Sequence, residues 1–123
     1  MISAGSGGNS TRTHRLAIVT NGGPAQRVKL RKIGLTDVVE QVFVSHEVGC
    51  AKPDPAIFEL AMGHLEVTPD EVAFVGDEPV IDLVPAAALG MTTVWRARAS
   101  WPRELALPAH RIERIGQLRE VLA

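Results

Sequence analysis

Residues 72–90 read VAFVGDEPVIDLVPAAALG, an apolar run followed by two aspartates and an alanine-rich segment. The run Val72–Val75 is apolar throughout and ends in Gly76-Asp77, which indicates a buried strand followed by a loop. Residues 79–89 are rich in alanine and are followed by Gly90, which predicts a helix with a glycine stop. A buried strand that leads directly into a helix is typical of a parallel sheet covered on both faces.

The same alternation runs along most of the chain. We expect strands at residues 16–20, 42–45, 72–75 and 92–95, each a short apolar or β-branched run. We expect helices at residues 24–33, 55–65 and 79–89, a capping box at Thr68–Glu71, and an amphipathic C-terminal helix carrying Ile112, Ile115, Leu118 and Val121-Leu122. Asp54 should cap the second of these helices, with Pro55 at its first position. The pattern predicts an α/β fold, a Rossmann-like parallel sheet of about four strands with helices on both faces.

Composition narrows the class of protein. The 123 residues are enough for one small domain, and the net charge of −1 argues against general binding to nucleic acid. No apolar run approaches the roughly 20 residues that span a bilayer, and the polar N-terminal residues do not resemble a secretory signal. The single cysteine, Cys50, fits a reducing cytoplasm. Residues 1–15 are rich in Gly, Ser and Thr, so we expect a flexible tail or linker there and a domain over residues 16–123.

Polar residues follow several of the expected strands, where open α/β sheets bind ligands. Asp77 and Asp82 lie just beyond the strand 72–75, and two carboxylates with open positions suit Mg²⁺. Either aspartate alone is more typical of a turn or a helix cap. The group Thr20-Asn21-Gly22 offers a hydroxyl, an amide and backbone N–H groups ahead of a helix, which suits phosphate but is also ordinary turn chemistry. Lys52, between Ala51 and Pro53, would orient a carboxylate or balance phosphate charge there, or be a solvated loop charge.

Three motifs together resemble one family. They are the apolar strand ending in Thr20-Asn21-Gly22, the segment VGCAKPDPAIF at residues 48–58, and FVGD with a second aspartate at Asp82. In this order they are similar to the haloacid dehalogenase (HAD) superfamily of hydrolases, in its phosphatase-like and dehalogenase-like branch. The small-residue helix that leads through Gly90-Met91 into the strand 92–95 also resembles that branch, so the resemblance covers roughly residues 15–123.

The resemblance implies roles for the site residues. Thr20 would hydrogen-bond a transferring phosphoryl group, with help from the Asn21 amide and the Gly22 N–H. Lys52 would neutralise the nucleophile and the phosphate. Asp77 would bind Mg²⁺ directly, and Asp82 would bind the metal or its water. The substrate would be a small phosphorylated or halogenated molecule.

One element of the family pattern has no counterpart. The resemblance calls for an aspartate nucleophile on a preceding strand that lies centrally in the sheet, yet the first aspartate in this sequence is Asp37. We therefore expect a partial HAD-like core with its central first strand missing, and no catalysis by the chain alone. As an alternative, the gap would make the chain a non-catalytic binding or assembly module that takes a strand from a second copy or from another polypeptide. A receiver-like or flavodoxin-like domain is a third interpretation.

Overall fold

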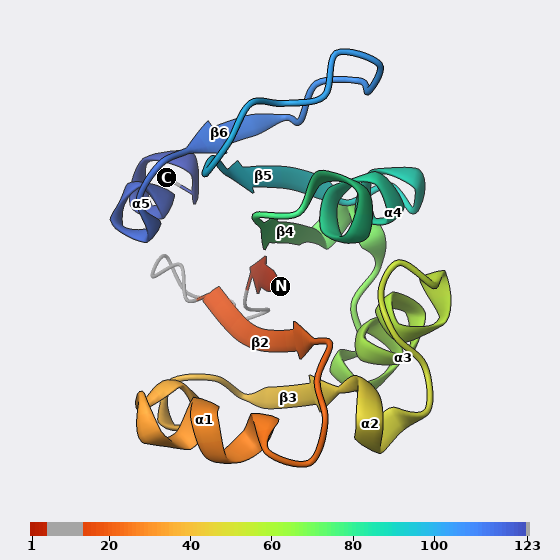
Figure 1. Ribbon diagram of the computed structural model, residues 1–123, viewed down its shortest axis with the longest axis vertical. Helices are drawn as coiled ribbons and strands as arrows, with labels where there is room; N and C mark the ends of the chain where they lie inside the picture. The colour runs from red at the N-terminus through yellow and green to blue at the C-terminus, as the bar shows by residue number, and fades with distance from the viewer. Residues whose placement is uncertain (5–13, 123) are drawn as a thin grey trace.

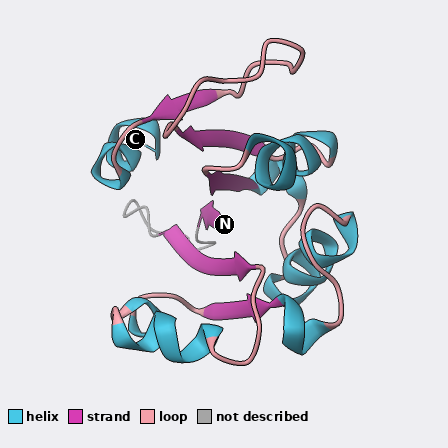
Figure 2. Ribbon diagram, in the orientation of Figure 1, coloured by secondary structure: helices cyan, strands magenta, loops and turns pink. Residues whose placement is uncertain are grey.

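The computed structural model describes residues 1–4 and 14–122 of the chain, and it shows an α/β fold around one mixed sheet (Figures 1 and 2). The six strands lie in the order β3-β2-β1-β4-β5-β6. Their bounds are β1 (Ile2–Ala4), β2 (His14–Thr20), β3 (Gln41–Val44), β4 (Val72–Gly76), β5 (Thr92–Arg96) and β6 (His110–Ile112). The pairs β2–β3 and β4–β5 are parallel, as the sequence predicts, and β5 pairs in parallel with β6, which the sequence did not predict as a strand.

The helices follow the strands as the alternation predicts. They are α1 (Gln26–Lys32), α2 (Ser45–Val48), α3 (Pro55–Leu65), α4 (Val84–Ala88) and α5 (Leu118–Leu122), with short helical turns η1 (Leu35–Asp37), η2 (Pro69–Glu71), η3 (Pro79–Leu83) and η4 (Ile115–Gln117). The carboxylate of Asp54 accepts the Ala56 N–H at 2.9 Å, which confirms the predicted cap of α3. The capping box between Thr68 and Glu71 is present as well.

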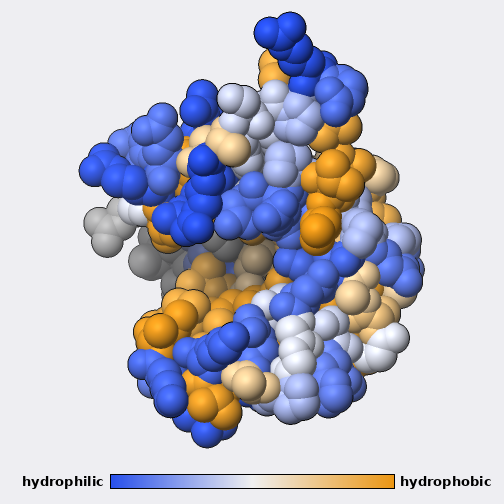
Figure 3. Space-filling model, in the orientation of Figure 1, coloured by the Kyte–Doolittle hydropathy of each residue, from blue (hydrophilic) through white to orange (hydrophobic). Residues whose placement is uncertain are grey.

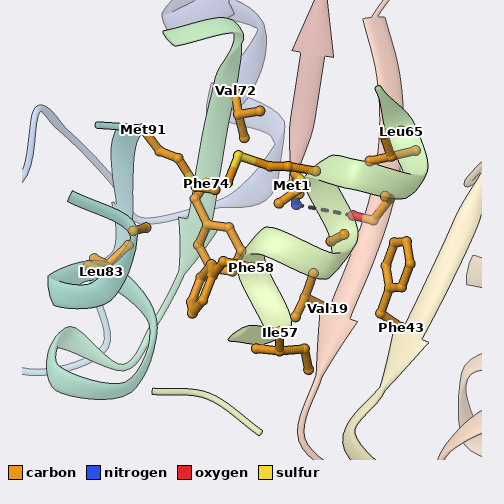
Figure 4. Close-up of a cluster of buried hydrophobic side chains, with 14 of the residues drawn as sticks. Met1, Val19, Phe43, Ile57, Phe58, Leu65, Val72, Phe74, Leu83 and Met91 are labelled. Atoms are coloured by element: carbon orange, nitrogen blue, oxygen red, sulfur yellow. Dashed lines mark hydrogen bonds between the residues drawn. The ribbon is translucent and has the colours of Figure 1, made fainter. Parts of the chain in front are cut away.

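Hydrophobic side chains pack on both faces of the sheet. The larger core joins α3 to the strands and to η3 and α4, and Phe58 packs against Phe74 with ring centroids 4.9 Å apart and ring planes tilted by 54° (Figure 4). The smaller cluster brings Leu30 of α1 against Val42 and Val44 of β3. In β3, Phe43 belongs to the larger core while its two neighbours belong to the smaller one. This alternation confirms that helices cover both faces.

Some apolar side chains stay on the surface (Figure 3). One group lies at α1 and η1 and includes Ile33 and Val38, and another lies at η3 and α4 and includes Val80 and Val84. The second group borders an apolar groove of about 510 Å³ between α3 and α4. In the described part of the chain, no helix has the length and hydrophobicity that a membrane crossing requires.

The N-terminal residues differ from the prediction. We expected a tail over residues 1–15, but Ile2–Ala4 form β1 in the centre of the sheet, between β2 and β4, and β2 begins at His14 (Figure 1). The remaining residues of that predicted tail, 5–13, lie outside the described residues. The position that we expected to be missing a strand therefore holds one, and it runs antiparallel to both neighbours.

The C-terminal region also differs. Residues 110–112, where the expected amphipathic helix begins, form β6, and helical structure follows only as η4 and α5. A three-residue strand has too little local pattern to be recognised, and β6 exists because β5 offers it a free edge. The strand count rises from about four to six because β1 and β6 are set by pairing across the sheet.

Candidate functional site

An ion pair between Lys52 and Asp82 lies at the carboxyl ends of the strands. The Lys52 Nζ atom is 2.6 Å from Asp82 Oδ1, and the two side chains are only 13% and 6% exposed. The ammonium also lies 5.9 Å from the centre of the Phe74 ring, which adds a cation–π contact. The alternative of a freely solvated lysine does not fit this arrangement, because the charge is partly buried and paired.

Gly76 makes room for the aspartate of this pair. A Cβ atom at Gly76 would lie 2.5 Å from Asp82 Cβ and 2.6 Å from its Oδ2, closer than side-chain contacts allow. The second carboxylate oxygen, Oδ2, accepts the Glu78 N–H at 3.2 Å. Asp82 is thus packed against the tip of β4, with both of its oxygens engaged.

Asn21 holds the backbone of Lys52 from the neighbouring strand end. Its Nδ2 donates to the Lys52 carbonyl at 2.8 Å, and its Oδ1 accepts the Lys52 N–H at 2.9 Å. This two-point contact joins the loop after β2 to the loop before α3, which are 31 residues apart in sequence. The amide of Asn21 therefore fixes the position from which the Lys52 side chain reaches Asp82.

The other two residues of the first motif are also tied down. The Thr20 hydroxyl accepts a hydrogen bond from Gln26 Nε2 at 2.9 Å. The Gly22 N–H donates to Ser45 Oγ at 2.9 Å, and the Ser45 hydroxyl donates back to the Gly22 carbonyl at 3.1 Å. These contacts join the ends of β2 and β3, so Thr20, Asn21 and Gly22 are held in fixed positions beside Lys52.

Asp77 has the more open carboxylate of the predicted acidic pair. Its side chain is 42% exposed, and its nearest cation is Arg98, whose Nε lies 3.8 Å from Asp77 Oδ2. Its backbone carbonyl accepts the Trp95 indole N–H at 3.2 Å, which ties the loop after β4 to the end of β5. The carboxylate is thus held at the strand end while remaining accessible from solvent.

The donor set suits a weakly held, hydrated cation. No group of three or more His, Cys, Asp or Glu side chains with metal-binding geometry occurs within residues 1–4 and 14–122. Mg²⁺ usually keeps several waters and needs only one or two protein carboxylates, so Asp77 has the chemistry to bind it. Asp82 is less available, because Lys52 and the Glu78 N–H occupy its two oxygens.

The structure joins three predicted residues that are far apart in sequence, because Asn21, Lys52 and Asp82 form a continuous chain of contacts. Thr20 and Gly22 are the sequence neighbours of Asn21, whereas Asp77 follows Gly76 at the end of β4 and contacts Arg98 and Trp95. Sequence analysis missed Gln26 and Arg98 as partners of the site. Gln26 is in the first turn of the helix after Thr20, and Arg98 comes just after β5. Their positions just beyond strand ends are the sequence signal that could have identified them as partners of the site.

Comparison with known proteins identifies the class to which this fold and site belong. Residues 11–90 match the family model of the haloacid dehalogenase-like hydrolases. The chain is 42% identical over 107 residues to a phosphoserine phosphatase from Thermus thermophilus, and 33% identical over 109 residues to (S)-2-haloacid dehalogenase 1 from a Pseudomonas species; each match spans 86% of this chain. A HAD phosphatase structure from Thermococcus onnurineus superposes with a TM-score of 0.80 at 36% identity over 89% of this chain.

The chain belongs to the haloacid dehalogenase-like hydrolase family. It spans about half the length of these relatives, namely 42% of the phosphatase, 48% of the dehalogenase and 50% of the Thermococcus structure. The predicted fold class and the predicted resemblance are confirmed.

Proposed function

We propose that this chain carries the phosphate-binding and metal-binding part of a Mg²⁺-dependent hydrolase of small phosphomonoesters. The observation that supports this most strongly is the paired, partly buried Lys52, which a two-point Asn21 contact fixes at the strand ends. A fixed cation in a partly dehydrated site stabilises phosphoryl charge more than a mobile surface lysine does.

Each residue has a defined task in this proposal. Lys52 contacts the phosphoryl oxygens. The Thr20 hydroxyl donates a hydrogen bond to one of them, while its oxygen accepts the hydrogen bond from Gln26 Nε2. Asn21 bonds the loop after β2 to the Lys52 backbone, and Gly22 bonds the same loop to Ser45. Asp82 orients the ammonium of Lys52 and assists at the metal. Asp77 binds Mg²⁺, which when bound would neutralise charge on the phosphoryl group.

Phosphomonoesters are the first choice of substrate because several relatives are phosphatases, including a glyceraldehyde 3-phosphate phosphatase from Pyrococcus abyssi at 36% identity. Haloacids are the second choice because of the dehalogenase relative and a matching 2-haloacid dehalogenase structure from Pseudomonas syringae with a TM-score of 0.76. Phosphate release and halide release from candidate substrates distinguish the two reactions.

We further propose that the 123-residue chain does not catalyse hydrolysis of the substrate by itself. Asp37, the first aspartate in the sequence, is exposed in η1 ahead of β3. It lies at the amino end of that parallel strand, while the site lies at the carboxyl ends. No other aspartate precedes Lys52, so the preceding-strand nucleophile that the family resemblance calls for has no counterpart among these residues.

Binding of inorganic phosphate in the presence of Mg²⁺, measured by calorimetry, tests the proposal directly. We expect Lys52→Met to weaken binding at least about tenfold, the equivalent of one lost charge-assisted contact of roughly 1.4 kcal/mol. Lys29→Met removes an exposed lysine from α1 and should leave binding unchanged. Equal affinity in the wild-type and Lys52→Met chains contradicts the proposed phosphate site. Mg²⁺-dependent hydrolysis of p-nitrophenyl phosphate by the pure chain, lost in Asp77→Asn, would contradict only the expected inactivity.

A further inference from the structure

Arg98 is an exposed cation beside the carboxylate that we assign to the metal. Its side chain is 62% exposed, and its Nε atom lies 3.8 Å from Asp77 Oδ2. This separation is longer than a hydrogen bond, so Asp77 does not occupy the N–H donors of the guanidinium. An exposed ion pair with such loose geometry contributes little free energy. Arg98 is therefore able to leave Asp77 when a second anion offers it a better partner.

The fold places Arg98 and Lys52 on opposite sides of Asp77. The Lys52 loop is bonded through Asn21 to the end of β2. Arg98 follows the end of β5, and β5 lies on the other side of β4 from β2 (Figure 1). Asp77 follows β4, and its carbonyl accepts the indole N–H of Trp95 in β5 at 3.2 Å. Along the carboxyl ends of the strands, Asp77 thus lies between the two cations.

Arg98 loses its partner when Asp77 binds a divalent cation. A carboxylate that coordinates a metal ion directly no longer offers its full charge to a neighbouring guanidinium, and the metal ion repels that guanidinium. The Arg98 side chain is long and solvent-exposed, so it can turn toward another anion without a change in the fold. Its planar set of N–H donors matches the two oxygens of a carboxylate. Metal binding therefore turns Arg98 from a counter-ion of Asp77 into an available anion-binding group.

We propose that Arg98 determines substrate specificity by binding a carboxylate on a small phosphomonoester whose phosphoryl group lies at Lys52 and Asp77. The inference rests on the proposed function, which assigns the phosphoryl group to Lys52 and the metal to Asp77. Neighbouring strands are about 4.8 Å apart, so two or three carbons between the phosphate and the carboxylate span the distance from the end of β4 to the end of β5. One guanidinium balances the single charge of a carboxylate, whereas a second phosphate would carry nearly two charges.

Binding of two non-hydrolysable probes to the whole 123-residue chain, measured by calorimetry at saturating Mg²⁺, tests this specificity. The probe 3-phosphonopropionate carries a phosphonate and a carboxylate, whereas propylphosphonate carries the phosphonate alone. We expect the carboxylate to lower Kd about fivefold to tenfold in the wild-type chain. Arg98→Met should lose this gain and still bind propylphosphonate, and Arg98→Lys should keep part of the gain. Arg103→Met removes an exposed arginine from the loop between β5 and β6 and should keep all of it.

Metal binding without any anion provides a readout of opposite sign. Mn²⁺ takes the place of Mg²⁺ here, because electron paramagnetic resonance measures the free ion directly. Arg98→Met should bind Mn²⁺ about twofold to fivefold more tightly than the wild-type chain, since no cation then competes for Asp77. In an Asp77→Asn background the same substitution should have no effect on Mn²⁺ affinity. A merely structural role of Arg98 would not strengthen metal binding while weakening binding of the carboxylate probe.

The outcomes distinguish this inference from the proposed function. If propylphosphonate binds and the carboxylate gives no gain in the wild-type chain, or the same gain in Arg98→Met, the role of Arg98 is overturned and the phosphate site stands. Unchanged Mn²⁺ affinity in Arg98→Met overturns the competition between Arg98 and the metal for Asp77. If neither probe binds to the wild-type chain at saturating Mg²⁺, the proposed phosphate site and the role of Arg98 are both overturned.

Discussion

The Lys52 ammonium and the Asp82 carboxylate, 2.6 Å apart and 30 residues apart in sequence, join the loop before α3 to the helical turn after β4. The first of these loops is in turn bonded to the end of β2 through Asn21. One partly buried ion pair therefore connects both halves of the sheet. The pair is structural, because neither charge has another oppositely charged partner within the described residues.

Removing one member of this pair should destabilise the fold. We expect Asp82→Asn to lower the free energy of unfolding by about 3 kcal/mol, because it leaves the partly buried Lys52 charge without its counter-ion. The double variant Asp82→Asn/Lys52→Met should recover much of that loss, since no charge is then left unpaired. Urea unfolding followed by circular dichroism measures both values. Additive losses in the double variant would show that the two residues are not coupled.

Gly76 should not tolerate a side chain. In Gly76→Ala the new Cβ meets Asp82 Cβ at 2.5 Å, so the carboxylate must move away from Lys52, and we expect a loss of roughly 1–3 kcal/mol in urea unfolding. Gly63→Ala is the matched control, because it lies within α3 and nothing lies within 4 Å of its Cβ position. Alanine at that helix position should be neutral or stabilising by up to about 1 kcal/mol. Equal effects at the two glycines would contradict the steric argument.

The contact between Asn21 and the Lys52 backbone should hold the Lys52 loop in a fixed position. Asn21→Ala removes two hydrogen bonds and should cost about 1–2 kcal/mol. Asn21→Asp keeps the acceptor for the Lys52 N–H but turns a carboxylate oxygen toward the Lys52 carbonyl oxygen, where two acceptors repel, so its loss should be at least as large. Hydrogen exchange at the Lys52 amide reports the contact directly. Exchange should accelerate in Asn21→Ala and change little in Thr36→Ala, which alters a residue of η1 outside the site.

Stability of the 123-residue chain with a free amino group should rise between pH 5 and pH 8. Burial lowers the pKa of the Met1 amino group from about 8 to about 5, with a further decrease from the charge of Lys52 and a smaller opposing effect of Asp82. Between these values the unfolded chain binds the proton and the folded chain does not, so this contribution is complete above pH 8 and is lost as the pH falls to 5.

Acetylation of the amino group isolates this effect. The acetylated chain keeps an N–H at Met1 but has no titrating amine there, so the difference in unfolding free energy between the two chains should change across pH 5–8 and level off outside that range. Urea unfolding at several pH values measures it. A constant difference would mean that the amino group is not buried in solution.

Local sequence determined much of this protein. The short apolar or β-branched runs at residues 16–20, 42–45, 72–75 and 92–95 favour strands covered on both sides, and the Asp54 cap and the Thr68 capping box act within a few residues. Because parallel strands align their carboxyl ends, the same pattern placed Thr20, Lys52 and Asp77 at one edge of the sheet before any contact was known.

Tertiary structure alone decided the rest. The short strands β1 and β6 exist because neighbouring edges accept them, and three residues carry too little periodicity to predict that. The pairing of Lys52 with Asp82 and the contact of Asn21 with Lys52 depend on how two loops meet across the sheet. Sequence spacing identifies the residues that follow a strand. Which of these residues contact one another depends on hydrogen-bond geometry and burial, and both arise only from packing.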